Sequence, residues 1–228
     1  MEMPPLQTAA HCRIIPKQRH SSREETPYVT RQLALAHFGI QVPDRDQLRV
    51  FVGPPLRQSF ARFGVPPASL DEAIARFRAR YVPIGKFENT PYPGIAGLLD
   101  RLQGAGYRLF VATSKPQVTA QEVLEHFQLA RYFERVCGAS LDAGRETKED
   151  VISYLLAQIG DPGQVVMVGD TAFDVLGAKV HGIPTIGVTW GYGQAESMRE
   201  AGAAALADTP EQLEALLHTP GVFSPAPP

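Results

Sequence analysis

The feature that most constrains this chain is a short apolar run, Val165 to Val168, that ends in Gly169-Asp170 and leads on to Asp174. Such a run is typical of a strand buried on both faces, as in a parallel sheet. Ligands of open α/β sheets bind just beyond the carboxyl ends of the strands, where Asp170 is expected. Two carboxylates there suit Mg²⁺, which keeps several waters and often bridges to phosphate. A simpler interpretation has Asp170 capping the next helix and Asp174 on its exposed first turn.

The chain from residue 91 to 217 alternates between helical and strand patterns. Apolar residues repeat at helical spacing from Ile95 to Leu102, and Thr147 and Thr209 are suitable N-caps for two later helices. The expected strands are Leu109–Ala112, Arg135–Gly138, Val165–Val168 and Thr185–Val188, and the other expected helices include Val123–Phe127 and Val175–Val180. Strands that alternate with helices predict βαβ units, a parallel sheet and right-handed crossovers.

The segment from residue 31 to 90 has a different pattern. Its expected short helices are Leu33–Phe38, Asp46–Phe51, Pro55–Phe63 and Ser69–Tyr81, with no convincing strand. We therefore predict a small all-helical domain at 31–90 and an α/β domain at 91–217, joined by a turn-rich hinge at Asn89–Pro93. Residues 1–30 are expected to be poorly ordered or loosely docked, and residues 218–228 to form a Pro-rich disordered tail.

The composition limits the environment and the partners. A net charge of −2 over 228 residues offers no electrostatic basis for binding nucleic acid or an anionic membrane. The two cysteines, Cys12 and Cys137, form no disulfide framework or metal-ligand spacing, which favours a reducing cytoplasm. No apolar run approaches the ~20 residues of a membrane span. We expect a cytoplasmic protein, a monomer or weak homodimer, with no nucleic-acid or membrane partner.

Other polar groups are expected near the same sheet edge as Asp170. Thr113 and Ser114 follow the strand Leu-Phe-Val-Ala, and their hydroxyl and backbone N–H groups could bind phosphate oxygens, although such hydroxyls often only cap helices. Lys148 begins a helix, where the macrodipole disfavours a cation. A solvated lysine is the ordinary alternative. A lysine that reaches the strand ends would instead neutralise phosphate charge.

Hydroxyl, lysine and paired carboxylates in this order resemble the haloacid dehalogenase-like hydrolase superfamily. Thr113 fits its second motif, Lys148 in RETKEDVI its third, and Asp170 with Asp174 in VGDTAFD its fourth. The resemblance covers roughly Leu33 to Leu217, and FVGPPLRQSF, FENTPYPGI and GVTWGYG are similar to the phosphoglycolate phosphatase and 5′-nucleotidase branch. It implies a Rossmann-like parallel-sheet core with a helical cap.

The resemblance also implies a function and roles for these residues. The activity would be Mg²⁺-dependent hydrolysis of a small phosphorylated metabolite, of the phosphoglycolate or nucleoside 5′-monophosphate type. Thr113 and Lys148 would be catalytic and, with Ser114, would bind phosphate. Asp170 and Asp174 would hold Mg²⁺, with Asp170 the closer ligand and Asp174 acting directly or through water. In the cap, Arg57, Tyr81 and Lys86 are candidates for contacts that set specificity, with a solvated or packing role as the ordinary alternative for each.

The first motif of the family, D-x-D-G-T or D-x-D-G-V at a strand end, has no match. Its first Asp would be the nucleophile and its second the general acid/base, yet the chain contains no aspartate before Asp44. Ile14-Ile15 is too short for a central strand and Pro16 would end it, so we expect the sheet to lack that strand. The only D-x-D, Asp44-Arg45-Asp46, follows a proline inside the cap, and we interpret Asp44 as a helix N-cap.

The missing motif leaves two hypotheses for this polypeptide. It is an inactive or impaired member of a phosphomonoesterase family, or a catalytically dead scaffold or regulator that binds Mg²⁺ and phosphate. A response-regulator-like receiver domain is disfavoured by the helical cap and by the absent acceptor aspartate. The loss of resemblance before Arg31–Leu33 would fit a start codon or reading frame that differs from that of an active ancestor, with a genuine pseudoenzyme as the alternative.

Overall fold

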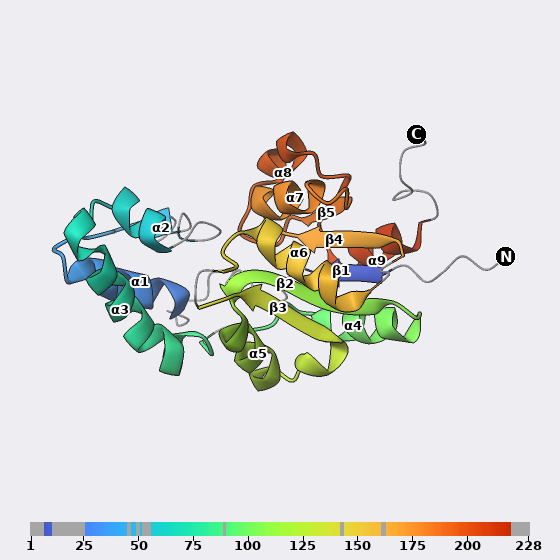
Figure 1. Cartoon of the computed structure of the whole chain (residues 1–228), viewed down its shortest axis with the longest axis horizontal. Helices are drawn as coiled ribbons and strands as arrows, with labels where there is room; N and C mark the ends of the chain where they lie inside the picture. The colour runs from blue at the N-terminus through green and yellow to red at the C-terminus, as the bar shows by residue number, and fades with distance from the viewer. Residues whose placement is uncertain are drawn as a thin grey trace. The chain divides into compact units, whose positions relative to one another are not determined.

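The computed structural model describes residues 7–10, 26–44, 47–48, 51, 56–88, 90–141, 144–160 and 163–219. These residues divide into two compact units. The sheet domain contains strand β1 and the chain from Pro91 onward, and the helical module contains the helices that precede Thr90 (Figure 1). Within the described ranges, no helix has the length and apolar character needed to cross a bilayer.

The sheet domain is built on a six-stranded parallel sheet in the order β3-β2-β1-β4-β5-β6. The strands are β1 (Gln7–Ala10), β2 (Arg108–Pro116), β3 (Arg135–Ala139), β4 (Val165–Gly169), β5 (Thr185–Val188) and β6 (Ala205–Ala207). The helices are α4 (Ile95–Gly104), α5 (Gln117–His126), α6 (Lys148–Ile159), α7 (Ala172–Lys179), α8 (Ala195–Ala201) and α9 (Pro210–His218). The predicted α/β class with a parallel Rossmann-like sheet is confirmed.

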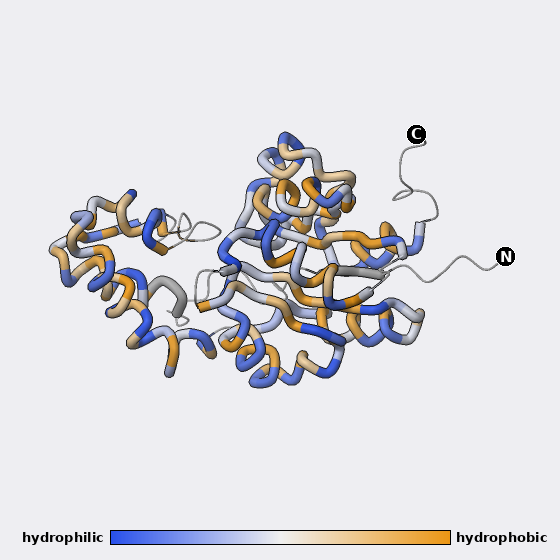
Figure 2. The backbone as a smooth tube through the Cα atoms, in the orientation of Figure 1, coloured by the Kyte–Doolittle hydropathy of each residue, from blue (hydrophilic) through white to orange (hydrophobic). Residues whose placement is uncertain are grey.

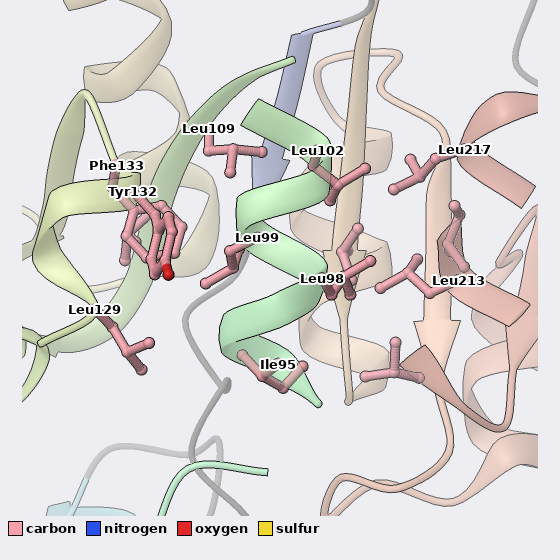
Figure 3. Close-up of a cluster of buried hydrophobic side chains, with 14 of the residues drawn as sticks. Ile95, Leu98, Leu99, Leu102, Leu109, Leu129, Tyr132, Phe133, Leu213 and Leu217 are labelled. Atoms are coloured by element: carbon pink, nitrogen blue, oxygen red, sulfur yellow. The ribbon is translucent and has the colours of Figure 1, made fainter. Parts of the chain in front are cut away.

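Side chains of the strands alternate between two buried layers. Leu109 and Val111 of β2 join α4 and α9 on one face, whereas Phe110 and Ala112 join α6 and α7 on the other. Figure 3 shows the leucines of α4 between residues 129–133 on one side and Leu213 and Leu217 of α9 on the other. The hydrophobic colouring of β4 in Figure 2 agrees with its burial at every position. The sheet is thus covered on both faces, and its polar groups lie at the strand ends.

The expectation that the sheet lacks its central strand is wrong. Gln7–Ala10 pairs in parallel with both β2 and β4, and so occupies the centre of the sheet. This strand precedes the Ile14–Ile15 pair in the chain. Parallel pairing is made by backbone N–H and C=O groups, so a short segment without β-branched apolar residues can fill the gap between two strands. Most of the other residues in 1–30, for which poor order is predicted, lie outside the described residues.

Two predicted helix caps are confirmed. The Thr147 hydroxyl accepts a hydrogen bond from the Asp150 N–H at 3.1 Å, and the Thr147 N–H donates to the Asp150 carboxylate at 2.9 Å, forming a capping box at the start of α6. The Thr209 hydroxyl accepts from the Gln212 N–H at 3.2 Å and begins α9. Helix α9 extends to His218, inside the predicted tail, and residues 220–228 lie outside the described residues.

The helical module has a small apolar core of its own. Its elements are α1 (Thr26–Ala36), α2 (Leu56–Arg62), α3 (Leu70–Arg80) and a π-helical turn η3 (Tyr81–Gly85). Leu35, Phe60 and Phe77 are buried together there. Much of the predicted helix Asp46–Phe51 lies outside the described residues, including Asp46 itself. Asp44 is exposed, and its carbonyl accepts from the Gln47 N–H at 3.2 Å.

Candidate active site

The strand register places Thr113 and Asp170 at the same level of the sheet. Ala10 of β1 pairs with Val111 of β2 and with Val168 of β4. Thr113 and Asp170 each follow their paired valine by two positions, so they lie on either side of the line of β1. Neighbouring strands are about 4.8 Å apart, so roughly 10 Å separates the backbones of β2 and β4 at this level.

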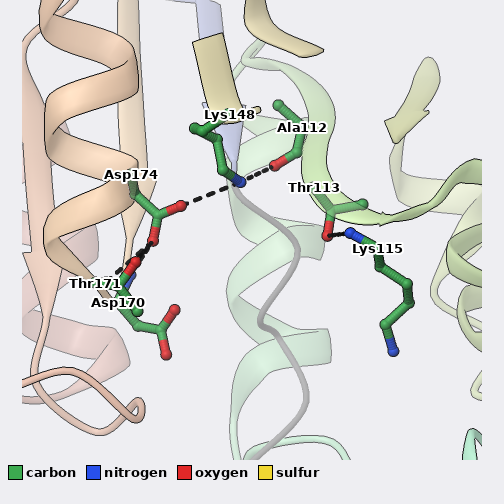
Figure 4. A network of polar contacts seen from close by, with 7 residues as sticks. All are labelled: Ala112, Thr113, Lys115, Lys148, Asp170, Thr171 and Asp174. Carbon is green, nitrogen blue, oxygen red and sulfur yellow. Dashed lines mark hydrogen bonds and ion pairs between the residues drawn. The ribbon is translucent and has the colours of Figure 1, made fainter. Parts of the chain in front are cut away.

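Lys148 reaches this edge from α6. Its Nζ lies 2.9 Å from the Ala112 carbonyl oxygen, to which it donates, and 3.1 Å from Oδ1 of Asp174 (Figure 4). The residue is only 7% exposed, so a solvated lysine is ruled out. A side chain at Gly177 would overlap the Lys148 stem, because its first carbon would lie 2.5 Å from Cγ. The fold therefore holds a buried ammonium beside Thr113.

The Asp174 carboxylate contacts three residues, Thr171, Asp170 and Lys148. Its Oδ2 accepts from the Thr171 N–H at 3.0 Å, the Thr171 hydroxyl at 2.8 Å and the Asp170 N–H at 3.2 Å. Its Oδ1 faces Lys148. The simpler interpretation of the G-D-x-x-x-D segment is thus wrong in both parts, because Thr171 is the N-cap of α7 and Asp174 is 1% exposed. Asp174 fixes the start of α7 and forms an ion pair with Lys148.

Asp170 is held by a loop that the sequence pattern did not assign to the site. Its Oδ2 accepts from the Tyr192 N–H at 2.8 Å, and its backbone carbonyl accepts from the Gly193 N–H at 3.0 Å. A side-chain carbon at Gly191 or Gly193 would overlap Asp170. The signal in the sequence was the Gly-Tyr-Gly that follows β5, since paired glycines often mark a close approach of two backbone segments.

Thr113 and Ser114 lie at an irregular end of β2. The pairing of β2 with β3 passes from Thr113–Gly138 to Pro116–Ala139, so Ser114 and Lys115 form a bulge. The Thr113 hydroxyl accepts from the Lys115 N–H at 3.2 Å and is largely buried, whereas Ser114 is exposed. The bulge places hydroxyl and backbone N–H groups at the edge that also carries Lys148 and Asp170.

The donor set at this edge fits Mg²⁺ bound together with phosphate. The described residues contain no group of three or more His, Cys, Asp or Glu side chains suited to a metal. Mg²⁺ does not need one, because it commonly binds through one or two carboxylates and fills its octahedron with water and phosphate oxygens. Asp170 supplies a buried carboxylate at the strand end. Asp174 already pairs with Lys148, so it is less available than Asp170 as a direct ligand of the metal.

Comparison with known proteins identifies the family. The sequence matches Haloacid dehalogenase-like hydrolase over residues 23–188. The chain belongs to this family. A haloacid dehalogenase-like chain is expected to place its motifs at the carboxyl edge of a parallel sheet, which is where Thr113, Lys148, Asp170 and Asp174 lie.

Named relatives of this haloacid dehalogenase-like chain include two bacterial enzymes. "Tyrosine-protein kinase PtkA" of Mycobacterium tuberculosis is 44% identical over 164 residues, which are 72% of this chain and 56% of that protein, so the match spans little more than half of PtkA. "5'-nucleotidase" of Pseudomonas aeruginosa is 41% identical over 170 residues, 74% of this chain and 77% of that protein. The crystal structure of a predicted phosphatase from Clostridium acetobutylicum is 35% identical, covers 94% of this chain and 98% of its own, and has a TM-score of 0.81.

Proposed function

We propose that this haloacid dehalogenase-like chain, which is of the phosphatase type by family, binds Mg²⁺ and the phosphate group of a small phosphorylated metabolite. The observation that carries the proposal is the position of the Lys148 ammonium, between the Ala112 carbonyl next to Thr113 and the Asp174 carboxylate next to Asp170. One cation thus joins the hydroxyl-bearing and the acidic strand ends, in a site suited to a phosphate dianion.

Each residue of the site has a separate proposed task. The Thr113 hydroxyl and the N–H groups of the bulge at Ser114 donate to phosphate oxygens. Lys148 neutralises phosphate charge without leaving its carboxylate partner. Asp170 holds Mg²⁺, which when bound supplies positive charge to the phosphate. Asp174 keeps Lys148 and the start of α7 in place, and reaches the metal through water.

We further propose that this polypeptide hydrolyses phosphomonoesters slowly or not at all. By family resemblance the attacking carboxylate belongs directly after the central strand, and the sequence that follows Ala10 is His11-Cys12-Arg13. Loss of a catalytic nucleophile can cost about 10⁶ in rate, because covalent catalysis splits one difficult step into two easier ones. A phosphate-binding scaffold or regulator that does not turn over its ligand is the second candidate, and the same absence favours it.

The proposed ligand is a phosphoglycolate-type or nucleoside 5′-monophosphate-type metabolite, in line with the branch that the sequence resembles. A reducing cytoplasm is the proposed location, on the basis of cysteine usage, and a monomer or weak homodimer the proposed state. Nucleic acid and membrane are not proposed as partners, given the net charge of −2.

The test combines binding with turnover on the whole chain. Calorimetric titration with inorganic phosphate in the presence of Mg²⁺ should give a saturable signal, which Asp170→Asn and Lys148→Met each remove. Asp100→Asn, which alters an exposed carboxylate of α4, should leave it intact. Turnover of p-nitrophenyl phosphate should remain near background. Absence of phosphate binding would disprove the site, and rapid Mg²⁺-dependent turnover abolished by Asp170→Asn would disprove the impaired state.

A further inference from the structure

The loop Thr189–Gly193, which follows β5, holds Asp170 at two points. The Tyr192 N–H donates to the Asp170 side chain and the Gly193 N–H to its backbone carbonyl. Glycines at 191 and 193 permit this approach, since a side chain at either would overlap Asp170. The orientation of the Asp170 carboxylate therefore depends on the position of this loop.

The loop is itself anchored at Thr189 and at Trp190. The Thr189 N–H donates to the Ala207 carbonyl at 3.0 Å, and the Thr189 hydroxyl donates to Asp208 at 2.6 Å. The Tyr92 hydroxyl donates a hydrogen bond to the Trp190 carbonyl, and the two rings meet edge to face with centroids 6.3 Å apart. Tyr92 thus forms a hydrogen bond with Trp190, and the residues that contact Asp170, Tyr192 and Gly193, follow two and three positions later.

Tyr92 lies at a particular point of the chain. It is in the segment that leads into α4, just after the helical module ends at Thr90. Its carbonyl accepts from the Ile95 N–H at 3.2 Å, and its ring packs on the main core of the sheet domain. A residue fixed at both its backbone and its ring can hold another segment in place through its hydroxyl.

We propose that Tyr92 is a positioning residue for the proposed Mg²⁺ site, acting through the Trp190 carbonyl and the Thr189–Gly193 loop on the Asp170 carboxylate. This inference rests on the proposed function in assigning Asp170 to Mg²⁺. Outer-shell partners that orient a ligand typically alter metal affinity by about 10–100-fold. Because Tyr92 acts through one further segment, we expect a smaller effect, roughly threefold to tenfold.

Trp190 can serve as the spectroscopic probe of the loop, and Tyr107 can serve as the control residue for Tyr92. Trp190 is the only tryptophan, so intrinsic tryptophan fluorescence reports on the loop alone. The Tyr107 hydroxyl also donates to a backbone carbonyl, that of Leu217 at 2.9 Å, and its ring packs on the same core. Tyr107 directly precedes β2 and so lies at the N-terminal end of this strand, whereas Thr113 lies toward its C-terminal end. Tyr107→Phe therefore removes a similar bond to a backbone carbonyl far from Asp170, together with the contact between the hydroxyl and His218 Nδ1 at 3.3 Å.

The experiment titrates the full chain and its variants with Mg²⁺ while Trp190 emission is recorded, and measures acrylamide quenching of Trp190 without metal. Tyr92→Phe should weaken Mg²⁺ affinity about threefold to tenfold and increase quenching, whereas Tyr107→Phe should leave both within about twofold. Asp170→Asn should abolish the Mg²⁺ response. Thermal unfolding of the two phenylalanine variants checks that they have similar stability.

The possible outcomes separate the two proposals. Unchanged Mg²⁺ affinity and quenching in Tyr92→Phe would overturn the positioning role, as would equal losses in Tyr92→Phe and Tyr107→Phe. If the unaltered chain shows no Mg²⁺ response, the metal assignment of the proposed function fails. The quenching comparison then still decides whether Tyr92 holds the loop.

Discussion

The Lys148 ammonium lies 3.1 Å from Oδ1 of Asp174, with the two side chains 5% and 1% exposed. Such a buried pair adds little stability relative to a well-packed apolar pair, because both charges lose their hydration. Removal of one partner is a different matter, since it leaves a buried charge without its counter-charge. The pair therefore joins the first turns of α6 and α7 and makes the site sensitive to single substitutions.

We predict that Lys148→Met lowers the free energy of unfolding by about 3–5 kcal/mol, because the Asp174 carboxylate loses its cation. The double variant Lys148→Met with Asp174→Asn should be less destabilised than the sum of the single variants, since asparagine is neutral and can still accept from Thr171. Urea unfolding of the single and double variants measures this coupling. Lys179→Met, at an exposed position of α7, is the matched control and should be close to neutral. Additive effects in the cycle would show that the two side chains do not interact.

Restoring the missing carboxylates should restore catalysis. We predict that replacing residues 11–15 with Asp-Leu-Asp-Gly-Thr raises Mg²⁺-dependent hydrolysis of p-nitrophenyl phosphate by several orders of magnitude, given the ~10⁶ associated with loss of a nucleophile. The graft directly continues β1, which ends at Ala10, so its aspartates at positions 11 and 13 bracket the level of Thr113 and Asp170, which lies two positions beyond Ala10. The control replaces the same residues with Asn-Leu-Asp-Gly-Thr and should remain near background. Equal rates in both chains would mean that the grafted aspartate does not attack phosphorus.

Gly191 should be required for metal binding. We predict that Gly191→Ala weakens Mg²⁺ affinity at least tenfold, the lower end of the range for residues that orient a ligand, because the added carbon overlaps the Asp170 side chain. Gly104→Ala, in α4, adds the same carbon into open space and should be neutral or stabilising by up to about 1 kcal/mol. Calorimetric Mg²⁺ titration with urea unfolding separates the two effects. Normal Mg²⁺ affinity in Gly191→Ala would count against Asp170 as the ligand.

The capping box of α6 should give a pH-dependent contribution to stability. Hydrogen bonds from the Thr147 N–H, the Thr147 hydroxyl and the Glu146 N–H lower the pKa of Asp150 from its ordinary value of 3.8. A carboxyl with a lowered folded-state pKa stabilises the fold above its unfolded pKa and loses that contribution as pH falls through the folded value. The destabilisation caused by Asp150→Asn should therefore be constant between pH 5, which is about one unit above the ordinary aspartate pKa, and pH 7. It should shrink as the pH falls below 3.8.

Urea unfolding across this range tests the effect. Thr147→Ala should cost about 0.5–2 kcal/mol at neutral pH, and Thr209→Ala, which removes a cap on α9, serves as its comparison. The two caps differ in that only Thr147 is paired with a carboxylate at the third helical position. A penalty for Asp150→Asn that stays the same at low pH would rule out the ionised carboxylate as its source.

The parallel sheet and most of its elements could be predicted from local pattern. The strand Thr185–Val188 has the predicted bounds, and Val165–Val168 and Arg135–Gly138 are each one residue shorter than the observed strands. Burial imposes apolar runs of strand length, and helices impose a 3.6-residue period, so such elements are visible in the sequence. The short strand β6 and helix α8 were not anticipated, because neither has an apolar run or a period long enough to be distinctive.

The residue types of the candidate site were likewise visible, but their partners were not. Thr113, Lys148, Asp170 and Asp174 could be selected because hydroxyl, ammonium and carboxylate groups stand at predicted strand ends or helix starts. Only the tertiary structure decided that Asp174 pairs with Lys148, that the Gly191–Gly193 loop holds Asp170, and that Gln7–Ala10 completes the sheet. Local pattern reports whether a residue is buried. Which groups meet depends on strand register and backbone hydrogen bonds between segments far apart in the chain, and these leave little trace in side-chain identity.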